Sequence, residues 1–254
     1  MDKHEDFTRA AYRDLLGSLL ERGYTGRTFL EVAPNRADLL LRHDIDLWPE
    51  AALELAQVEH DLGLSADYFF LLNSSAYDPT DKDTQAVFRQ LQFLGHRIGL
   101  HFDAALYEDD LDTLDREAAR ECSALEALIN APVAMISFHR PARSLLGLVN
   151  NVAGRAHTYQ PRFFEQIGYC SDSRGGWFHG RPLDHAAVAE GHALQLLTHP
   201  VWWATDCRGD REAALACVVE AKGNKIKLTI EQTVTGYCAE TGHIVEKNML
   251  HKKV

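Results

Sequence analysis

Continuously apolar segments alternate with amphipathic segments along most of the chain. Apolar residues at helical spacing predict helices over 49–64, 84–95 and 109–130. Short runs rich in apolar residues predict strands over 38–43, 66–72, 97–102, 133–139, 167–173 and 193–199. Strands that alternate with helices pair in parallel through right-handed crossovers. The pattern therefore predicts an α/β fold, either a barrel or a doubly wound sheet.

The two ends of the chain depart from this alternation. Residues 1–37 are expected to form a helical extension, and residues 210–254 a C-terminal extension with a helix over 211–223. Beyond Asn224 the pattern predicts no definite element. No internal repeat, low-complexity tract or linker divides the chain, so a single domain is expected over 1–254.

Length and charge narrow the range of functions. A chain of 254 residues that is 46% hydrophobic can bury one large α/β core. Its formal net charge is −11, with 26 Lys and Arg against 37 Asp and Glu, and no basic cluster relieves it. A polyanion such as nucleic acid is therefore not the expected partner, whereas a neutral or cationic substrate or a bound metal cation fits better.

Compartment and redox state follow from what the sequence lacks. The N-terminal 24 residues carry charges throughout, and nowhere do about 18 apolar residues run together, so neither a secretory signal nor a membrane span is expected. We expect a soluble, cytoplasmic protein. No C-x-x-C pair occurs, so reduced thiols are expected for the five cysteines, Cys122, Cys170, Cys207, Cys217 and Cys238.

Ionisable residues gather where the predicted strands stop. In parallel α/β folds these carboxyl ends form one face, where sites assemble from residues far apart in the sequence. One His or Asp at a strand end is usually a helix cap or a satisfied polar contact, but recurrence at five strand ends points to one site. The residues are His43, Asp44, Asp46, His101, Asp103, His139, Arg140, Asp172 and His199.

Carboxylates and imidazoles together permit a narrow range of chemistry. They are ligands for zinc or a similar first-row cation, which lowers the pKa of water and polarises a carbonyl. A further Asp can accept the proton of the water, and a His can protonate the leaving group. The set therefore indicates hydrolysis of an ester or an amide.

Five short motifs occur in one order along residues 38–203. They are RHDID (42–46), GHRIGLH (95–101), HRPAR (139–143), SDSRGGW (171–177) and LLTHP (196–200). In this order they resemble the motifs of polysaccharide deacetylases of the NodB-homology superfamily, although Arg97 stands where that family has Glu. The form with RHDID and GLHFD is similar to deacetylase-like proteins of O-antigen and capsule biosynthesis. The resemblance implies a distorted (β/α) barrel of about seven parallel strands.

The resemblance implies roles for the two carboxylates of the first motif. Asp44 matches the catalytic base and Asp46 the metal-binding carboxylate, although the family has the two adjacent and here Ile45 separates them. In an extended chain both side chains point to the same side. Either carboxylate can therefore face the metal.

The metal ligands implied by the resemblance are incomplete. His101 matches the first metal histidine, but Ala105 stands four residues on, where the family has the second. We expect His139, at the end of the next strand, to replace it, with Asp103 and His43 as weaker substitutes. The expected cofactor is a divalent metal, zinc by its ligand types.

The remaining roles follow from the later motifs. Arg140 matches the arginine that orients the base, His199 the general acid, and Asp172 a residue that holds an imidazole or arginine in place. His96 is expected to be a core or loop histidine. Of the three tryptophans, Trp177 is expected to line the cleft and stack on a sugar, and Trp202 to pack, whereas for Trp203 both readings stay open.

Together these observations predict a metal-dependent deacetylase that acts on a sugar of a bacterial surface polysaccharide or its precursor. Two alternatives stay open. Asp44-x-Asp46 is also the metal signature of nucleotide-sugar glycosyltransferases, although that motif leaves the histidines unexplained. The other alternative is a catalytically inactive, carbohydrate-binding barrel that kept the shape of the site after losing a ligand at Ala105.

Overall fold

The computed structural model describes residues 7–178, 180–204, 210–234 and 237–244. The chain divides into two compact units, Met1–Arg211 and Glu212–Val254. The second unit contains almost all of α7 (Arg211–Thr233) and an antiparallel pair of strands, β9 (Tyr237–Cys238) and β10 (His243–Ile244). Helix α7 therefore continues past Asn224, where the sequence predicted no definite element.

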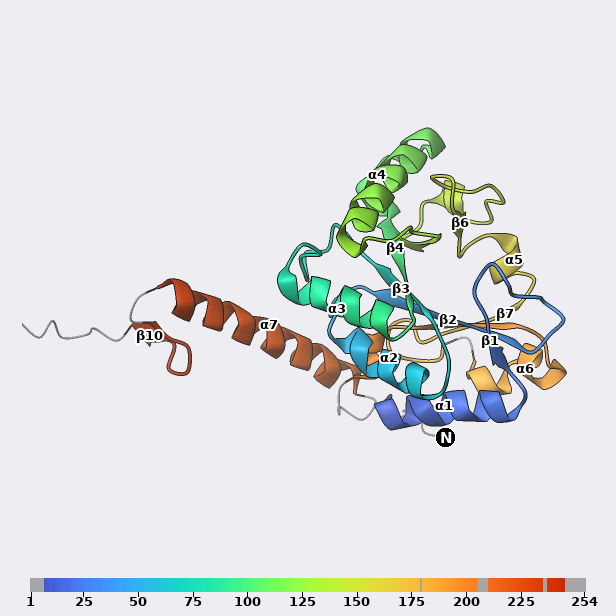
Figure 1. Cartoon of the computed structure of the whole chain (residues 1–254), viewed down its shortest axis with the longest axis horizontal. Helices are drawn as coiled ribbons and strands as arrows, with labels where there is room; N and C mark the ends of the chain where they lie inside the picture. Colours follow the sequence, from blue (N-terminus) through green and yellow to red (C-terminus); the bar gives the residue numbers. More distant parts are fainter. Residues whose placement is uncertain (1–6, 179, 205–209, 235–236, 245–254) are drawn as a thin grey trace, which may run out of the picture. The chain divides into compact units, whose positions relative to one another are not determined.

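The first unit is built on one parallel sheet (Figure 1). Its strands follow the order β6 (Ala156–His157), β5 (Met135–His139), β4 (Arg97–Asp103), β3 (Asp67–Phe70), β2 (Asp38–Ile45), β8 (Leu194–Thr198) and β7 (Gly168–Ser171). Strand β1 (Thr25–Gly26) adds a short parallel pairing to β2. These seven parallel strands confirm the predicted α/β fold of the distorted-barrel type. Strands β1 and β6 were not predicted, because two residues are too few to show a period.

Helices cover the outer face of this sheet (Figure 1). Successive pairs of the first four helices are in contact, and α3 and α4 also contact β4. These helices are α1 (Arg9–Glu21), α2 (Ala51–Asp61), α3 (Lys82–Phe93) and α4 (Leu111–Ile129). Shorter turns of helix complete the unit: η1 (Ala104–Leu106), η2 (Arg143–Leu145), α5 (Pro161–Phe164), η3 (Pro182–Asp184), α6 (Ala186–Glu190) and η4 (Pro200–Trp202).

Strand β2 is buried along its whole length, and its side chains alternate between two environments. Leu39 and Leu41 belong to the main apolar core, which contains residues of the outer helices. Leu40 belongs to a smaller core on the other side of the sheet. Alternation along a strand therefore puts Arg42 and Asp44 on the inner side with Leu40, and His43 on the side of the helices.

The outer side of β2 contains a buried polar cluster around Glu59 of α2. The carboxylate of Glu59 accepts hydrogen bonds from Tyr12 Oη at 2.5 Å and Tyr68 Oη at 2.7 Å, and lies 2.6 Å from His43 Nε2. Burial opposes ionisation of Glu59, but the neighbouring His43 outweighs it and lowers the pKa of the carboxyl. Thr198 Oγ1 lies 2.7 Å from the other ring nitrogen of His43, so every polar atom of this cluster has a partner.

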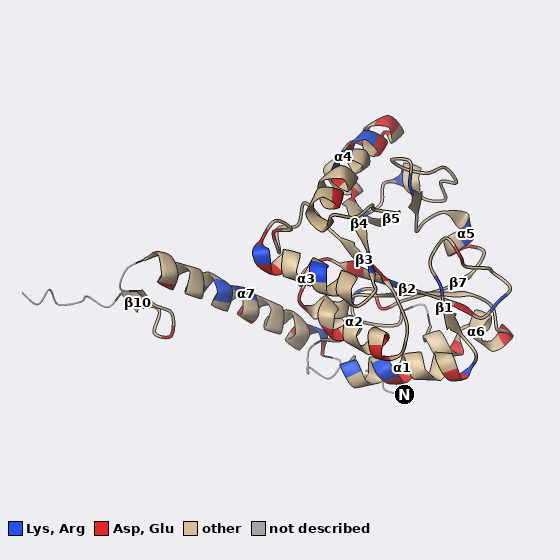
Figure 2. Cartoon of the chain, in the orientation of Figure 1, with Lys and Arg blue, Asp and Glu red and all other residues tan. Residues whose placement is uncertain are grey.

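Charges of both signs are mixed over the surface of the first unit. Figure 2 shows Lys and Arg scattered among Asp and Glu over its helices. No described helix is both long and apolar enough to span a membrane.

Cys122 and Cys170 are buried, outside any disulfide, and burial raises the pKa of each thiol to about 12. Cys207 lies outside the described residues.

Candidate metal centre

The inner side chains at the carboxyl ends of the strands come from five segments. Asp44 of β2 and His101 of β4 are buried, and Asp46 follows β2 directly. Residue 99 must be glycine for this face to pack, because a Cβ there would lie 2.5 Å from the ring of Phe69. His139 ends β5, Asp172 follows β7 and His199 follows β8. The structure thus brings to one edge of the sheet residues that lie far apart in the sequence.

Asp46, His101 and His139 form a candidate metal cluster. Their nearest ligand atoms all lie within 4.8 Å of one another. Asp46 Oδ1 lies 3.2 Å from His101 Nε2 and 3.6 Å from His139 Nδ1. That oxygen is buried and has no hydrogen-bond partner among the described residues. A buried carboxylate oxygen without a hydrogen bond is costly, and a protonated imidazole or a bound metal cation would each relieve the cost.

The protonation of the three ligands suits a cation. His101 Nδ1 lies 2.5 Å from Ser137 Oγ, which leaves Nε2 to face Asp46. Burial lowers the pKa of His139, so its ring is neutral at pH 7 and has a lone pair to donate. Burial opposes ionisation of Asp46, but the neighbouring imidazoles, His101 first, outweigh it and lower the pKa of its carboxyl. One carboxylate and two imidazoles are a common donor set for zinc that keeps a position open for a substrate or water.

Asp44 lies beside this cluster, with Oδ2 3.7 Å from His101 Nε2, and it pairs with a buried arginine. Arg42 Nε and Nη2 donate to the two carboxylate oxygens of Asp44 at 3.0 and 2.7 Å. Ser137 Oγ also donates to Asp44, at 3.3 Å. Burial opposes ionisation of Asp44, but the Arg42 guanidinium outweighs it and lowers the pKa of the carboxyl. Asp44 is therefore an ionised acceptor fixed in one orientation.

His199 and Asp172 form a second pair near Asp46. His199 Nδ1 lies 2.6 Å from Asp172 Oδ1, and its Nε2 lies 3.9 Å from Asp46 Oδ2. Asp172 also accepts from the backbone N–H of His199 and from Trp203 Nε1, so both of its oxygens are used. Burial opposes protonation of His199, but the Asp172 carboxylate outweighs it and raises its pKa to about 9. His199 is thus a proton donor at neutral pH.

A small cavity lies between the two pairs. It has a volume of about 30 Å³ and is lined by residues 44–48 and 199–202. A volume of roughly 10–15 Å³ suffices for one water molecule, so the cavity has room for a water between Asp44, Asp46 and His199.

Arg140 differs from its expected position. The sequence assigned it to orienting the base, but its guanidinium pairs with Asp103, with Nε donating to Oδ1 at 3.0 Å. Arg140 has a left-handed backbone (φ 46°) directly after β5, and its side chain is 57% exposed. The arginine that contacts Asp44 is instead Arg42. Asp103, one of the weaker substitutes for the missing ligand, is occupied by this pair.

Other residues named from the sequence lie outside the cluster. His43 faces Glu59 on the outer side of the sheet. His96 is buried between Ala56 O and Ala66 N–H, as expected for a core histidine. Trp177 lies among aromatic rings, with the ring of Trp203 6.1 Å away.

Arg42 and Ser137 are site residues to which the sequence reasoning gave no role. For Arg42 a signal was present, since a charged residue two positions before Asp44 in a buried strand shares its face. A buried arginine on that face needs a carboxylate partner. For Ser137 the same alternation with His139 was visible, but a serine in an apolar strand is too common to single out.

His139→Ala is expected to weaken zinc binding by at least tenfold. The substitution removes one of three ligand atoms, and Ala105 offers no replacement. The affinity would be measured by titration against a competing chelator. His192→Ala is the matched control, because His192 lies outside the cluster and pairs with Glu190. Normal zinc affinity with reduced turnover in His139→Ala would remove His139 from the ligands.

Comparisons with known proteins give only distant likenesses. No family model matches the sequence, and a search of curated proteins found no match. Among solved structures, a CE4 esterase from Streptococcus mutans is similar with a TM-score of 0.48 and 12% identity, over 87% of this chain and 89% of that chain. A family 4 carbohydrate esterase from Bacillus anthracis has a TM-score of 0.44 and 14% identity, over 84% and 85%. The chitin deacetylase from Colletotrichum lindemuthianum has a TM-score of 0.41 and 15% identity, over 78% and 86%. Likenesses this distant carry no inference about the site or its reaction.

Proposed function

We propose that this protein is a metal-dependent hydrolase that removes an acyl group, acetyl by its motifs, from a sugar. The observation that carries the proposal is Asp46 Oδ1, a buried carboxylate oxygen that lacks a hydrogen bond and faces His101 and His139. The ordered motifs of the polysaccharide deacetylase type support the acyl group and the sugar. Bacterial surface polysaccharide biosynthesis, with a cytoplasmic precursor as substrate, is the proposed setting on the same motif resemblance.

The three ligand atoms fit zinc. When bound, zinc would polarise the acyl carbonyl and lower the pKa of the attacking water. Asp46, His101 and His139 would hold it, and Ser137 would fix the ring of His101 through Nδ1.

The other residues supply proton transfer. Asp44, ionised and held by Arg42, accepts a proton from the water that attacks the acyl carbon. His199, protonated through its contact with Asp172, donates a proton to the departing amine or alkoxide as its bond to the acyl carbon breaks. Asp44 and His199 both line the small cavity beside Asp46, one ionised as the base and the other protonated as the acid.

We expect Arg42 to orient the base in place of Arg140. Arg42→Lys keeps the charge but loses the two-pronged hydrogen bond, so kcat per folded molecule should fall by about 10²-fold with little change in KM. Arg140→Ala, at an exposed position, should lower kcat by less than about tenfold. The opposite ranking in steady-state kinetics would return the role to Arg140.

The two alternatives predict other arrangements. A glycosyltransferase of the Asp-x-Asp type would use the carboxylates around a cation, but Asp44 is occupied by Arg42 in a buried pair. That function also leaves the His199–Asp172 pair without a role. An inactive barrel would give no role to a cluster of one carboxylate and two imidazoles whose ligand atoms lie within 4.8 Å of one another.

Acetate release tests the proposed function. Purified protein, treated with chelator and reloaded with zinc, would be given acetylated amino sugars that are free, nucleotide-linked or polymeric. Zinc-dependent release of acetate from at least one of them is expected. If the zinc-loaded protein releases no acetate but transfers sugar from a nucleotide donor, the glycosyltransferase alternative holds instead.

A further inference from the structure

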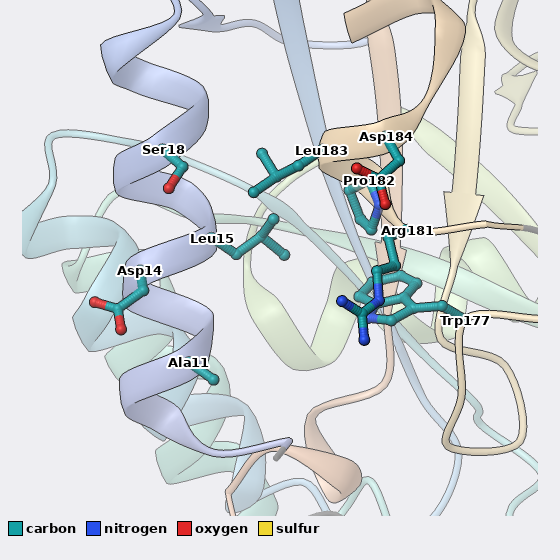
Figure 3. Close-up of a pocket in the computed structure, with 9 residues that line it drawn as sticks. All are labelled: Ala11, Asp14, Leu15, Ser18, Trp177, Arg181, Pro182, Leu183 and Asp184. Carbon is teal, nitrogen blue, oxygen red and sulfur yellow. The ribbon is translucent and has the colours of Figure 1, made fainter. Parts of the chain in front are cut away.

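A cavity for which the proposed function has no use lies beside α1. It is a cavity of about 340 Å³ between α1 and the segment that carries Trp177 and residues 181–184 (Figure 3). None of its lining residues belongs to the candidate metal cluster or to the proton-transfer pairs. Small-molecule sites have volumes of roughly 300–1,000 Å³, so this cavity has room for one ring-sized ligand.

One side of the cavity is apolar and fixed in place. The indole of Trp177 has the rings of Phe7 and Trp203 behind it, at centroid distances of 5.9 and 6.1 Å. Figure 3 shows Leu15 of α1 and Leu183 pointing toward each other across the cavity. A flat aromatic surface that is held by other rings loses little entropy when a ligand stacks on it.

The rest of the lining offers both donors and acceptors. Ser18 and Asp14 come from α1, where Asp14 points away from Trp177, and Arg181 and Asp184 come from the opposite segment (Figure 3). Arg22 Nη1 donates to the carbonyl of Leu183 at 2.9 Å, which ties the end of α1 to that segment. Two carboxylates, one guanidinium and one hydroxyl thus surround the apolar surface.

This combination selects the chemical class of the ligand. An anion would meet two carboxylates against one guanidinium. A wholly apolar ligand would remove water from charged groups without replacing their hydrogen bonds. A neutral sugar ring has an apolar C–H face and hydroxyl groups at its edge, which both donate and accept. It therefore matches an aromatic plate bordered by carboxylates and a guanidinium.

We propose that this cavity is a second, non-catalytic carbohydrate site. A single pyranose ring would stack on Trp177, with its hydroxyl groups bonded to Arg181 and Asp184. The inference goes beyond the proposed function and does not depend on a metal. Such a site would hold one sugar unit of a glycan chain while another sugar unit of the same chain is at the metal centre.

Protein-detected NMR tests this site directly. The four Trp indole N–H resonances of the full chain, treated with chelator, would be followed during titration with glucose, N-acetylglucosamine and chitotriose, and Trp177→Phe would assign one of them. Saturable shifts of the Trp177 resonance are expected, with a Kd on the order of 1 mM for a single neutral ring. Because acetate release is not the readout, failure of the proposed function would leave this result unchanged.

Matched variants locate the binding. Ser18→Trp would fill the cavity, and Asp184→Ala would remove one acceptor at an exposed position, so each should weaken binding at least tenfold. Glu21→Ala, on α1 but outside the cavity, should bind as the wild type does. A thermal melt checks the fold of Ser18→Trp, and Asp184→Ala keeps the test valid if that variant unfolds. Binding unaffected by both variants, no saturable shift with any sugar, or stronger shifts with tetramethylammonium or phosphate would each overturn the proposal.

Discussion

His199→Ala is expected to lower turnover by about 10²- to 10⁴-fold while zinc binding and the fold are retained. The side chain is the proposed donor to the leaving group, and no other described imidazole lies against Asp172. Asp172 keeps its bonds to the backbone N–H of residue 199 and to Trp203 Nε1, so the local structure has support after truncation. The measurement is kcat for acetate release per folded molecule, with zinc content determined on the same sample.

The pH dependence provides a second readout of His199. A general acid must be protonated, so the rate should fall as pH rises through the pKa of His199. That pKa is raised to about 9 by Asp172 against burial, and a cation nearby would lower it, so the alkaline fall is expected at or below about pH 9. In His199→Ala this alkaline fall should disappear. A variant that loses stability but keeps its rate per folded molecule would instead give His199 a packing role only.

Asp44→Asn is expected to lose turnover to a similar extent, because an amide cannot accept the proton of the water. It should also lose stability, since Arg42 would remain buried without a carboxylate. The rate must therefore be expressed per folded molecule, from a parallel denaturation curve. A folded Asp44→Asn protein with wild-type kcat would move the base to another residue.

Glu59→Ala is expected to lower the free energy of unfolding by about 3–5 kcal/mol. The substitution leaves the hydroxyls of Tyr12 and Tyr68 and one nitrogen of His43 buried without their partner, and it opens a cavity between α2 and β2. Urea unfolding followed by Trp fluorescence measures this, because the Trp residues lie at 48, 177, 202 and 203, all within the first unit.

Glu54→Ala is the matched control on the same helix. Its carboxylate pairs with Arg9 at 2.6 Å, but both side chains are about half exposed, so the free energy of unfolding should change by less than about 0.5 kcal/mol. Equal effects of the two substitutions would mean that the cluster around Glu59 contributes no more than a surface pair does. Both residues are glutamates of α2, so the expected difference arises because Glu59 is buried with three partners whereas Glu54 pairs with Arg9 at the surface.

The fold was predictable because the apolar pattern is strong in its central strands. Strand β2 contains the apolar run Leu39–Leu41 followed by charged residues, and this run fits a strand buried on both faces. Helix α4 shows a regular apolar stripe of Leu114, Ala118, Cys122 and Leu125. Strands β1 and β6 could not be predicted, because their two residues each are fixed by pairing with a neighbouring strand.

The site was predictable in position more than in detail. Ionisable residues recur at the predicted strand ends, and from this we predicted that Asp46, His101 and His139 share one site. Their ligand atoms do lie together. The arginine assignment was less successful, because a motif gives the residue type and not the direction of its side chain. Arg140 has a left-handed backbone, and its guanidinium pairs with Asp103. The spacing of residues in a motif does not predict such a backbone conformation.

Metal content tests the central claim most directly. Wild-type protein and Asp46→Ala, both purified without chelator, would be compared by elemental analysis for moles of divalent metal per mole of chain. We expect close to one zinc per wild-type chain and almost none in Asp46→Ala, because Asp46 Oδ1 is the oxygen that the two imidazoles face. A wild-type protein without stoichiometric metal, or an Asp46→Ala protein with unchanged metal content, would contradict the account.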